Sequence, residues 1–283
     1  MTPNTTEITL GHSPDPDDAF MHWALAANRI DTDEIRFRHI LEDIETLNGW
    51  AREGRLHVTA ISIHAYAYVH ERYALLPHGA SMGERYGPVV IAKQRLSLSD
   101  LRGKKIAVPG LLTTAYLALR LALEDFEPLV VPFDRIMEFV AEGKADAGLL
   151  IHEGQLTFGE AGFQKVTDLG EWWHGETGLP LPLGGNAIRK DLGELIPRIS
   201  GYLRESILYG LRHREEALAH AEKYGRDLDR PLTDRFVGMY VNDATLDYGE
   251  KGRRAVEELL QRGYRAGLLP RPPHLLGLFV EEV

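Results

Sequence analysis

The sequence predicts an α/β protein with two lobes, and two observations lead to this prediction. First, strand and helix patterns alternate along the chain to about residue 190, and helical patterns fill the remainder. Such alternation is typical of α/β folds. Second, two buried strand patterns end in polar residues, at Ser62 and at His152. Because open α/β sheets bind ligands at the carboxyl ends of their strands, these ends predict two walls of one cleft.

The first ninety residues predict alternating strands and helices. Segment 34–41 alternates charged and apolar side chains, which is typical of a half-exposed strand. Asp43 is expected to begin a helix and Gly54 to end it, since these residue types favour the two ends. The expected strands are 7–10, 34–41, 56–63 and 87–93, and the expected helices are 19–28 and 43–53.

The loop 11–18 (GHSPDPDD) contains two prolines, which disfavour regular strand pairing. Ser13 or Asp17 is expected to cap the helix that follows, because either side chain can accept a hydrogen bond from a free N–H group. Two interpretations of Asp15, Asp17 and Asp18 stay open. Capping and solvation is favoured over a metal-binding trio, since oxygen-ligand metal sites need more converging ligands.

A new strand–helix unit is expected from residue 105. An apolar strand, 105–108, passes through a Pro-Gly turn into a helix over 113–123. Thr113 and Thr114 lie at its start, where hydroxyls and backbone N–H groups can bind an anion. A plain threonine cap is the alternative. Further strands are expected at 129–131, 147–151 and 164–169, further helices at 134–142 and from 171, and mainly helices after 191.

Segment 145–158 carries the main functional signal. A short apolar run ends at Ile151, and His152, Glu153 and Gly154 follow at once. Because the pKa of histidine lies near neutrality, a histidine in this position suits a general base. From the local sequence alone, a structural histidine is an equal alternative.

Two segments are expected to cross between the lobes, because each lacks an adjoining helix. They are 87–93 and 181–189. The larger lobe is then discontinuous and consists of 1–92 plus 187–283, with the C-terminal helices. The smaller α/β lobe is 93–186.

Composition limits the classes of function. The chain has 283 residues, no cysteine and a formal net charge of −10. An acidic surface argues against nonspecific binding to nucleic acid or a membrane surface, and the lack of cysteine excludes disulfides and a thiol nucleophile. No apolar run reaches the roughly 18 residues that span a bilayer, and the first residues lack a secretory signal pattern. The expected location is the cytoplasm.

Several catalytic motifs are absent. The sequence lacks the phosphate loop GxxxxGK[ST], a helix-opening GxGxxG, the zinc motif HExxH and the hydrolase motif GxSxG. Its twelve histidines show no spacing typical of metal ligands. Nucleotide hydrolysis, zinc proteolysis and α/β-hydrolase chemistry are therefore poorly supported.

Five stretches together carry a resemblance to a known enzyme family. They are HSPDPDDAF (12–20), TAIS (59–62), GLLTTA (110–115), IHEGQLTF (151–158) and MYVNDATLD (239–247). In this order they resemble the 1,4-dihydroxy-6-naphthoate synthases of the futalosine route to menaquinone. The family usually has Ser-Pro-Cys-Pro-Asn-Asp-Thr-Phe at the first stretch, where this chain has Asp15, Asp17 and Ala19 instead.

The resemblance implies a fold, a reaction and a site. The fold is that of type II periplasmic binding proteins, with two α/β lobes around a central ligand cleft. The reaction is that of a lyase, which converts cyclic dehypoxanthine futalosine to 1,4-dihydroxy-6-naphthoate and a sugar-derived fragment. No metal or organic cofactor is implied. His152 is implied as the general base, Glu153 as a supporting residue, and the substrate-binding residues as Asn48, Ser62, Thr113, Thr114 and Ala115.

Two other functions are compatible with the same fold. One is a non-catalytic protein that binds a small anion, and the other is the sister enzyme of the pathway, which dehydrates chorismate derivatives. In each case the expected partner is a small anionic molecule, with no nucleic acid and no membrane. The sequence leaves monomer and homodimer open.

Overall fold

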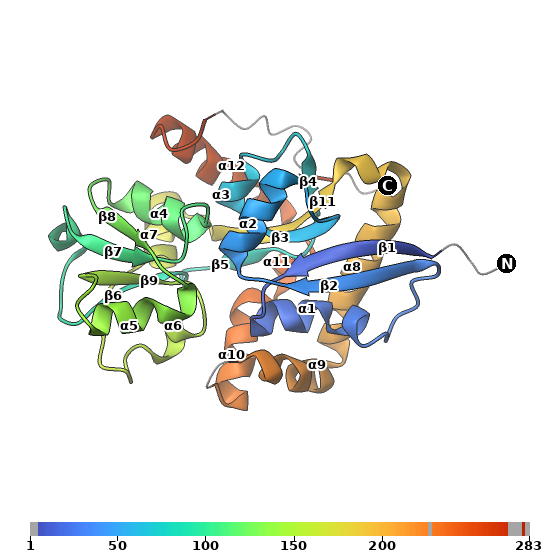
Figure 1. The fold of residues 1–283 in the computed structure, drawn as a ribbon, viewed down its shortest axis with the longest axis horizontal. Coiled ribbons are helices and arrows are strands. Elements are labelled where there is room, and N and C mark those ends of the chain that lie inside the picture. The colour runs from blue at the N-terminus through green and yellow to red at the C-terminus, as the bar shows by residue number, and fades with distance from the viewer. Residues whose placement is uncertain (1–4, 226–227, 271–278, 281–283) are drawn as a thin grey trace. The chain divides into compact units, whose positions relative to one another are not determined.

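The chain forms two compact α/β units, each with its own sheet (Figure 1). The computed structural model describes residues 5–225, 228–270 and 279–280. The first unit contains the described residues before Met82, together with Gly184–Gly249 and residues 279–280. The second contains Met82–Leu183 and the described residues from Glu250 onward to 270.

The sheet of the first unit has parallel strands at its centre. Within the described residues its strand order is β2-β1-β3-β11-β4, with β5 paired to β11. Strands β2 and β3 both run parallel to β1, whereas β11 runs antiparallel to β3. The three parallel strands therefore end at one edge of the sheet. The strands are β1 (Thr6–His12), β2 (Ile35–Leu41), β3 (Val58–Ser62), β4 (Tyr73–Leu75), β5 (Ser81–Gly83) and β11 (Leu181–Arg189).

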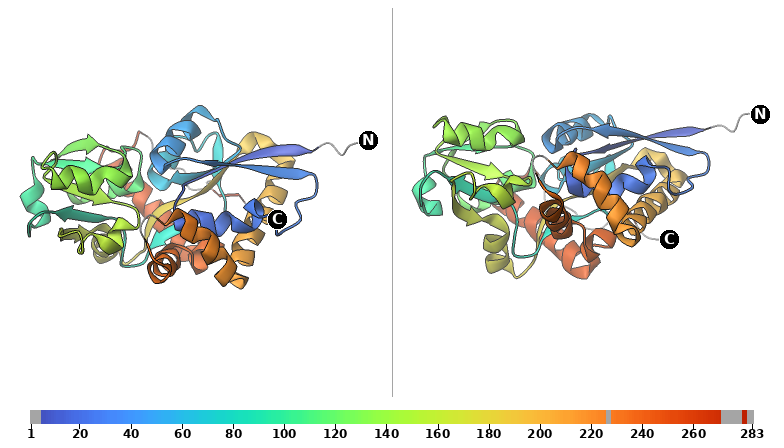
Figure 2. Two further views of the ribbon diagram at one scale, coloured as in Figure 1. Left: turned by 60° about the horizontal axis from the view of Figure 1, so that its bottom comes forward. Right: turned by 90° about the horizontal axis from the view of Figure 1, so that it is seen from below.

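Helices pack against this sheet and against one another. Helix α1 contacts α8, α9 and α10, and both Figure 1 and Figure 2 show these helices beside it. Apolar side chains of α1, among them Phe20 and Met21, meet Ile207 of α8 and Val237 of α10 in a buried cluster. The helical segments are α1 (Pro16–Ala26), α2 (Ile44–Glu53), α3 (Ile63–Tyr66), η3 (Lys190–Leu195), α8 (Ile196–Arg212), α9 (Arg214–Ala221), η4 (Glu222–Tyr224), α10 (Arg230–Tyr240) and α11 (Asp243–Leu246).

Helix α2 confirms the helix predicted over 43–53. Asp43 Oδ1 accepts hydrogen bonds from the backbone N–H groups of Glu45 and Thr46, at 3.0 and 3.1 Å. At the other end, Gly54 adopts the left-handed conformation (φ 73°), which glycine reaches at little cost. Both ends are thus set by local residue chemistry that can be read from the sequence.

The start of α1 corrects two predictions. The helix begins at Pro16, with Asp15 in the capping position, so neither Ser13 nor Asp17 is the cap. Proline fixes the backbone of the first helical turn and needs no N–H acceptor there, which explains the earlier start. Asp18 is 8% exposed and accepts a hydrogen bond from the Ser13 N–H at 2.7 Å. The solvation interpretation is therefore wrong for Asp18.

The sheet of the second unit also contains a parallel group. Within the described residues its order is β10-β6-β9-β7-β8. Strands β8 and β9 run parallel to β7, and β6 pairs antiparallel with both β9 and β10. The strands are β6 (Val89–Ala92), β7 (Lys105–Val108), β8 (Glu127–Val130), β9 (Ala147–Leu150) and β10 (Gln164–Asp168).

A glycine on β9 allows a helix to approach this sheet closely. A Cβ atom on Gly148 would lie 2.5 Å from Ile136 Cγ2 and 2.9 Å from Val140 Cγ2, both on α5. Helix α5 therefore packs directly on β9, and its apolar side chains join a buried cluster with the sheet. The helical segments of this unit are η1 (Leu98–Leu101), α4 (Thr114–Ala122), η2 (Phe133–Arg135), α5 (Ile136–Ala141), α6 (Gly154–Thr157), α7 (Leu169–Thr177) and α12 (Gly249–Arg265).

The units divide the chain at other points than the predicted lobes do. The chain changes unit within β5 and within β11, at Ser81–Met82 and Leu183–Gly184. All of α12 after Gly249 belongs to the second unit, whereas the sequence prediction places it in the first lobe. Its Arg262 guanidinium lies 5.3 Å from the ring centre of Trp173 on α7, which explains the attachment. Residues 1–4, 226–227, 271–278 and 281–283 of the predicted larger lobe lie outside the described residues.

Candidate active site

In the second unit, two of the predicted site segments follow neighbouring parallel strands. Thr113–Ala115 come after β7, and His152 comes after β9. Since β7 and β9 pair in parallel, both segments lie at the same edge of the sheet. This is the edge at which open α/β sheets bind ligands.

The start of α4 confirms the threonine cap. Thr113 Oγ1 accepts a hydrogen bond from the Tyr116 N–H at 3.2 Å and donates one to the Gly110 carbonyl oxygen, also at 3.2 Å. Thr114 and Ala115 are the first two helical residues, and they are 2% and 3% exposed. Anion binding by this helix start, the other interpretation, stays a prediction.

His152 is held in a buried position by its own segment and by an aromatic ring. Its Nδ1 accepts a hydrogen bond from the Gly154 N–H at 3.0 Å. The ring of Phe133 meets the imidazole edge to face, with ring centres 5.5 Å apart. Among the described residues, Nε2 has no hydrogen-bond partner. The imidazole is therefore fixed through Nδ1, which leaves Nε2 as the atom available to a substrate.

The carboxylate next in the chain also approaches this ring. Glu153 Oε2 lies 3.7 Å from His152 Nδ1, and both side chains are buried. Charged side chains are rarely buried without a partner that favours their charge. The sequence analysis gave Glu153 only a supporting role, and Phe133 was missed because it lies nineteen residues away on another element (152 − 133 = 19).

In the first unit, the structure brings Asn48 and Ser62 together. Asn48 Nδ2 donates to Ser62 Oγ at 3.0 Å, and Asn48 Oδ1 accepts from the Ser62 N–H at 2.9 Å. Both residues are buried, Asn48 fully so. The pair joins α2 to the end of β3 and fixes the direction of the Ser62 hydroxyl. The binding role predicted for each residue is not tested by this geometry.

The loop before α1 contains carboxyl groups with raised pKa values. Burial, reinforced by the Asp15 carboxylate, raises the pKa of Asp18 to about 7, although the Ser13 N–H opposes this. Burial and the carboxylates of Asp18 and Asp15 also raise the pKa of Asp17. Within the described ranges, no three or more histidine or acidic side chains are arranged to hold a metal ion.

Three histidines that the sequence analysis missed form a buried group, here called the histidine cluster. They are His12 on β1, His22 on α1 and His39 on β2. His12 Nε2 and His39 Nδ1 share a hydrogen bond of 3.0 Å, and the ring centres of His12 and His22 are 4.8 Å apart. Neither ring nitrogen of His22 has a partner within the described part of the chain. Since the three come from separate elements, no local spacing indicates them.

Burial lowers the pKa of every member of the histidine cluster. It lowers the pKa of His12 to about 3, assisted by His39, and that of His39 to about 4, assisted by His220. It also lowers the pKa of His22, assisted by His12, His39 and His78. The folded protein therefore binds fewer protons here than the unfolded chain below the ordinary histidine pKa of about 6.5. This contribution to stability is present above that pH and is lost as the pH falls toward 3–4.

Replacing His22 with leucine is expected to stabilise the protein, most of all in acid. The variant removes two buried nitrogens without hydrogen-bond partners, a change worth on the order of 1–3 kcal/mol. The gain in unfolding free energy should be larger at pH 5 than at pH 8. Asp17 and Asp18 titrate in the opposite sense, but they do so in both proteins. Urea unfolding of wild type and His22→Leu at the two pH values measures the difference, and an equal gain at both would contradict it.

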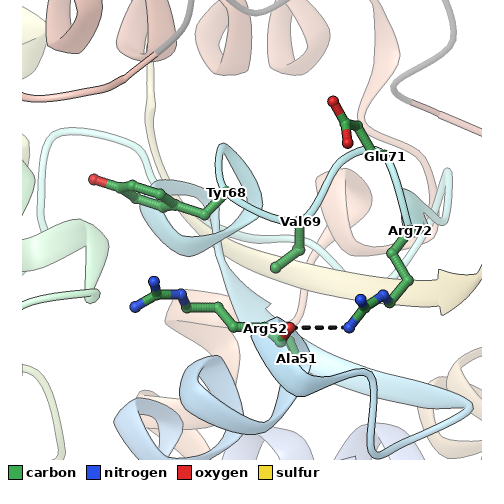
Figure 3. A pocket seen from close by; sticks show the side chains of 6 residues that line it. All are labelled: Ala51, Arg52, Tyr68, Val69, Glu71 and Arg72. Carbon is green, nitrogen blue, oxygen red and sulfur yellow. Dashed lines mark hydrogen bonds between the residues drawn. The ribbon is translucent and has the colours of Figure 1, made fainter.

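A surface pocket in the first unit lies apart from these residues. It has a volume of about 370 Å³ and is lined by Ala51, Arg52, Tyr68, Val69, Glu71 and Arg72. Figure 3 shows the Arg72 guanidinium donating to the carbonyl oxygen of Arg52, and this hydrogen bond is 2.9 Å long. The lining includes none of the predicted site residues.

Comparison with known proteins identifies relatives along nearly the whole chain. A family model described as "Menaquinone biosynthesis" matches residues 8–265. A 1,4-dihydroxy-6-naphthoate synthase of Thermus thermophilus is 44% identical over 94% of this chain and 98% of its own. One from Streptomyces coelicolor is 36% identical over 93% of this chain and 95% of its own.

Solved structures confirm the predicted fold class. A crystal structure of an Archaeoglobus fulgidus protein superposes with a TM-score of 0.88 at 47% identity, covering 93% of this chain and 98% of its own. A Candida albicans protein with the generic periplasmic binding protein fold gives 0.74 at 11% identity, covering 95% and 93%. In the described part of the chain, no helix is long and apolar enough to cross a membrane.

Proposed function

The chain belongs to the menaquinone-biosynthesis family, and we propose that it is a 1,4-dihydroxy-6-naphthoate synthase in which His152 is the general base. The observation that carries the catalytic assignment is the imidazole at the carboxyl end of β9. It is buried, anchored through Nδ1, and has Nε2 without a hydrogen-bond partner among the described residues. The two curated relatives named for this activity support the reaction.

The proposed reaction is an elimination from cyclic dehypoxanthine futalosine. His152 takes a proton from a ring carbon, and the electron pair of that C–H bond forms a ring double bond. The bond to the sugar-derived fragment breaks, and the fragment leaves with that electron pair and takes up a proton. Because the product ring is aromatic, the elimination is favourable and requires little beyond a placed base. Such a base contributes roughly 10²–10⁴-fold to the rate.

Substrate binding is proposed for residues of both units. Helix α4 begins at Thr114, and its first-turn N–H groups suit a carboxylate or sugar oxygen of an anionic substrate. Thr113 would shape this helix start through its cap, and Ala115 lacks a side chain that would crowd it. In the first unit, Ser62 would contact the substrate through its hydroxyl, which Asn48 orients.

An assay with defined substrates tests the proposed function. The purified chain is incubated with cyclic dehypoxanthine futalosine, and dihydroxynaphthoate is detected by mass. Formation of this product is the expected result. Tight binding of an anion without turnover would instead support the non-catalytic alternative, and turnover of a chorismate derivative would support the sister dehydratase. The cytoplasm as the place of the reaction, and monomer or homodimer as the state of the chain, remain predictions.

A further inference from the structure

The hydrogen bond at His152 Nδ1 determines which ring nitrogen carries the proton in the neutral side chain. A backbone N–H can only donate, so Nδ1 must offer a lone pair to the Gly154 N–H. The neutral imidazole in this structure therefore carries its proton on Nε2. An imidazole in this form donates a hydrogen bond through Nε2 and cannot accept a proton there.

A base that acts through Nε2 needs the other tautomer. Its proton must lie on Nδ1, and a buried Nδ1–H group needs an acceptor. The Glu153 carboxylate is in place for this role, since its Oε2 lies 3.7 Å from Nδ1 and is the carboxylate oxygen that pairs with this ring. A shift of about 1 Å would bring the two atoms to the 2.7–2.9 Å of a charge-assisted hydrogen bond.

We propose that Glu153 is a positioning residue that converts His152 into its base tautomer, by accepting a hydrogen bond from Nδ1–H in place of the one that Gly154 donates. This inference rests on the proposed function of His152. The same carboxylate then stabilises the imidazolium that forms when Nε2 takes the substrate proton. The Gly154 hydrogen bond holds the resting form, and the Glu153 hydrogen bond holds the reacting form.

The surroundings of the ring favour a small change of this kind. Phe133 contacts the imidazole edge to face and offers no hydrogen-bonding group. The side chains of His152 and Glu153 are 7% and 4% exposed, so water competes little for Nδ1. In such a dry environment the exchange of one partner for the other strongly changes the preferred tautomer.

The tautomer can be observed directly by ¹⁵N NMR of the imidazole in the wild-type chain. The free protein is expected to show protonated Nε2, and the complex with 1,4-dihydroxy-6-naphthoate protonated Nδ1. Persistence of protonated Nε2 in the complex would overturn the proposal. This measurement needs no variant, so it stands even if a change at the buried Glu153 impairs folding.

Kinetics of Glu153→Gln provide the second test. The kcat value should fall at least about tenfold, and by no more than in His152→Ala, while KM stays close to that of wild type. In a His152→Ala background the second substitution should cause no further loss, because Glu153 acts only through the imidazole. Wild-type kcat in Glu153→Gln would overturn this inference alone. Lack of turnover in the wild type would overturn the proposed function instead.

Discussion

Replacing His152 with alanine is expected to lower kcat by roughly 10²–10⁴-fold, the contribution of a positioned general base. The variant loses the only group assigned to proton removal. Folding should be retained, since the bonds lost are one from the Gly154 N–H and the edge contact with Phe133. Positioning by the rest of the site remains, so a residual rate above that in water is expected.

Product formation measured by mass, together with thermal unfolding, checks this prediction. His152→Ala should unfold as a single cooperative transition close to that of wild type and should still bind 1,4-dihydroxy-6-naphthoate. A matched control is His213→Ala, because the His213 side chain is 43% exposed and lies in the first unit. The control should keep wild-type kcat. Full activity in His152→Ala would exclude His152 as the base.

Much of the fold could be predicted where local chemistry decides it. Asp43 and Gly54 set the ends of α2 through a side-chain cap and a left-handed turn, and both are visible in the sequence. The end of β9 at His152 was predicted from the length of the apolar run. Because β9 and β7 are parallel neighbours, the sites predicted on separate segments, at Thr113 and His152, fall at one edge.

The parts that could not be predicted depend on contacts between distant segments. His22 meets His12 and His39 only after β1, α1 and β2 have packed, so no spacing indicates the histidine cluster. The attachment of α12 to the second unit depends on contacts such as that of Arg262 with Trp173, ninety positions earlier (262 − 173 = 89). An amphipathic pattern shows that a helix has a buried face, but it does not identify the surface that covers it.

The candidate site shows the same division. Motifs indicated His152, but the pairing of Asn48 with Ser62 and the position of Phe133 are properties of the folded chain. The tautomer of His152 is likewise set by a hydrogen bond within its own turn, which the motif does not specify. Sequence can thus name the reacting residue, while the groups that determine its protonation require the structure.

Replacing Gly154 with alanine is expected to lower kcat by about 10²-fold without unfolding the protein. The added Cβ would lie 2.6 Å from Cε1 and 3.1 Å from Nδ1 of His152, so the imidazole must move. Met137 Cε, at 3.3 Å, leaves little room on the other side. A displacement of about 1 Å of a catalytic group can cost this factor. The backbone of Gly154 is not left-handed, so alanine introduces no backbone strain of that kind.

The control is a second glycine in the same segment. A Cβ on Gly159 would meet no heavy atom within 4 Å, and its backbone is not left-handed either, so Gly159→Ala should keep wild-type kcat. Steady-state kinetics of the two variants separate crowding of His152 from any general effect of a Gly→Ala change on this turn. In a His152→Ala background, Gly154→Ala should cause little further loss, since the ring it displaces is gone. An additive loss there, or an equal loss in Gly159→Ala, would mean that the turn affects turnover by a route other than the position of the imidazole.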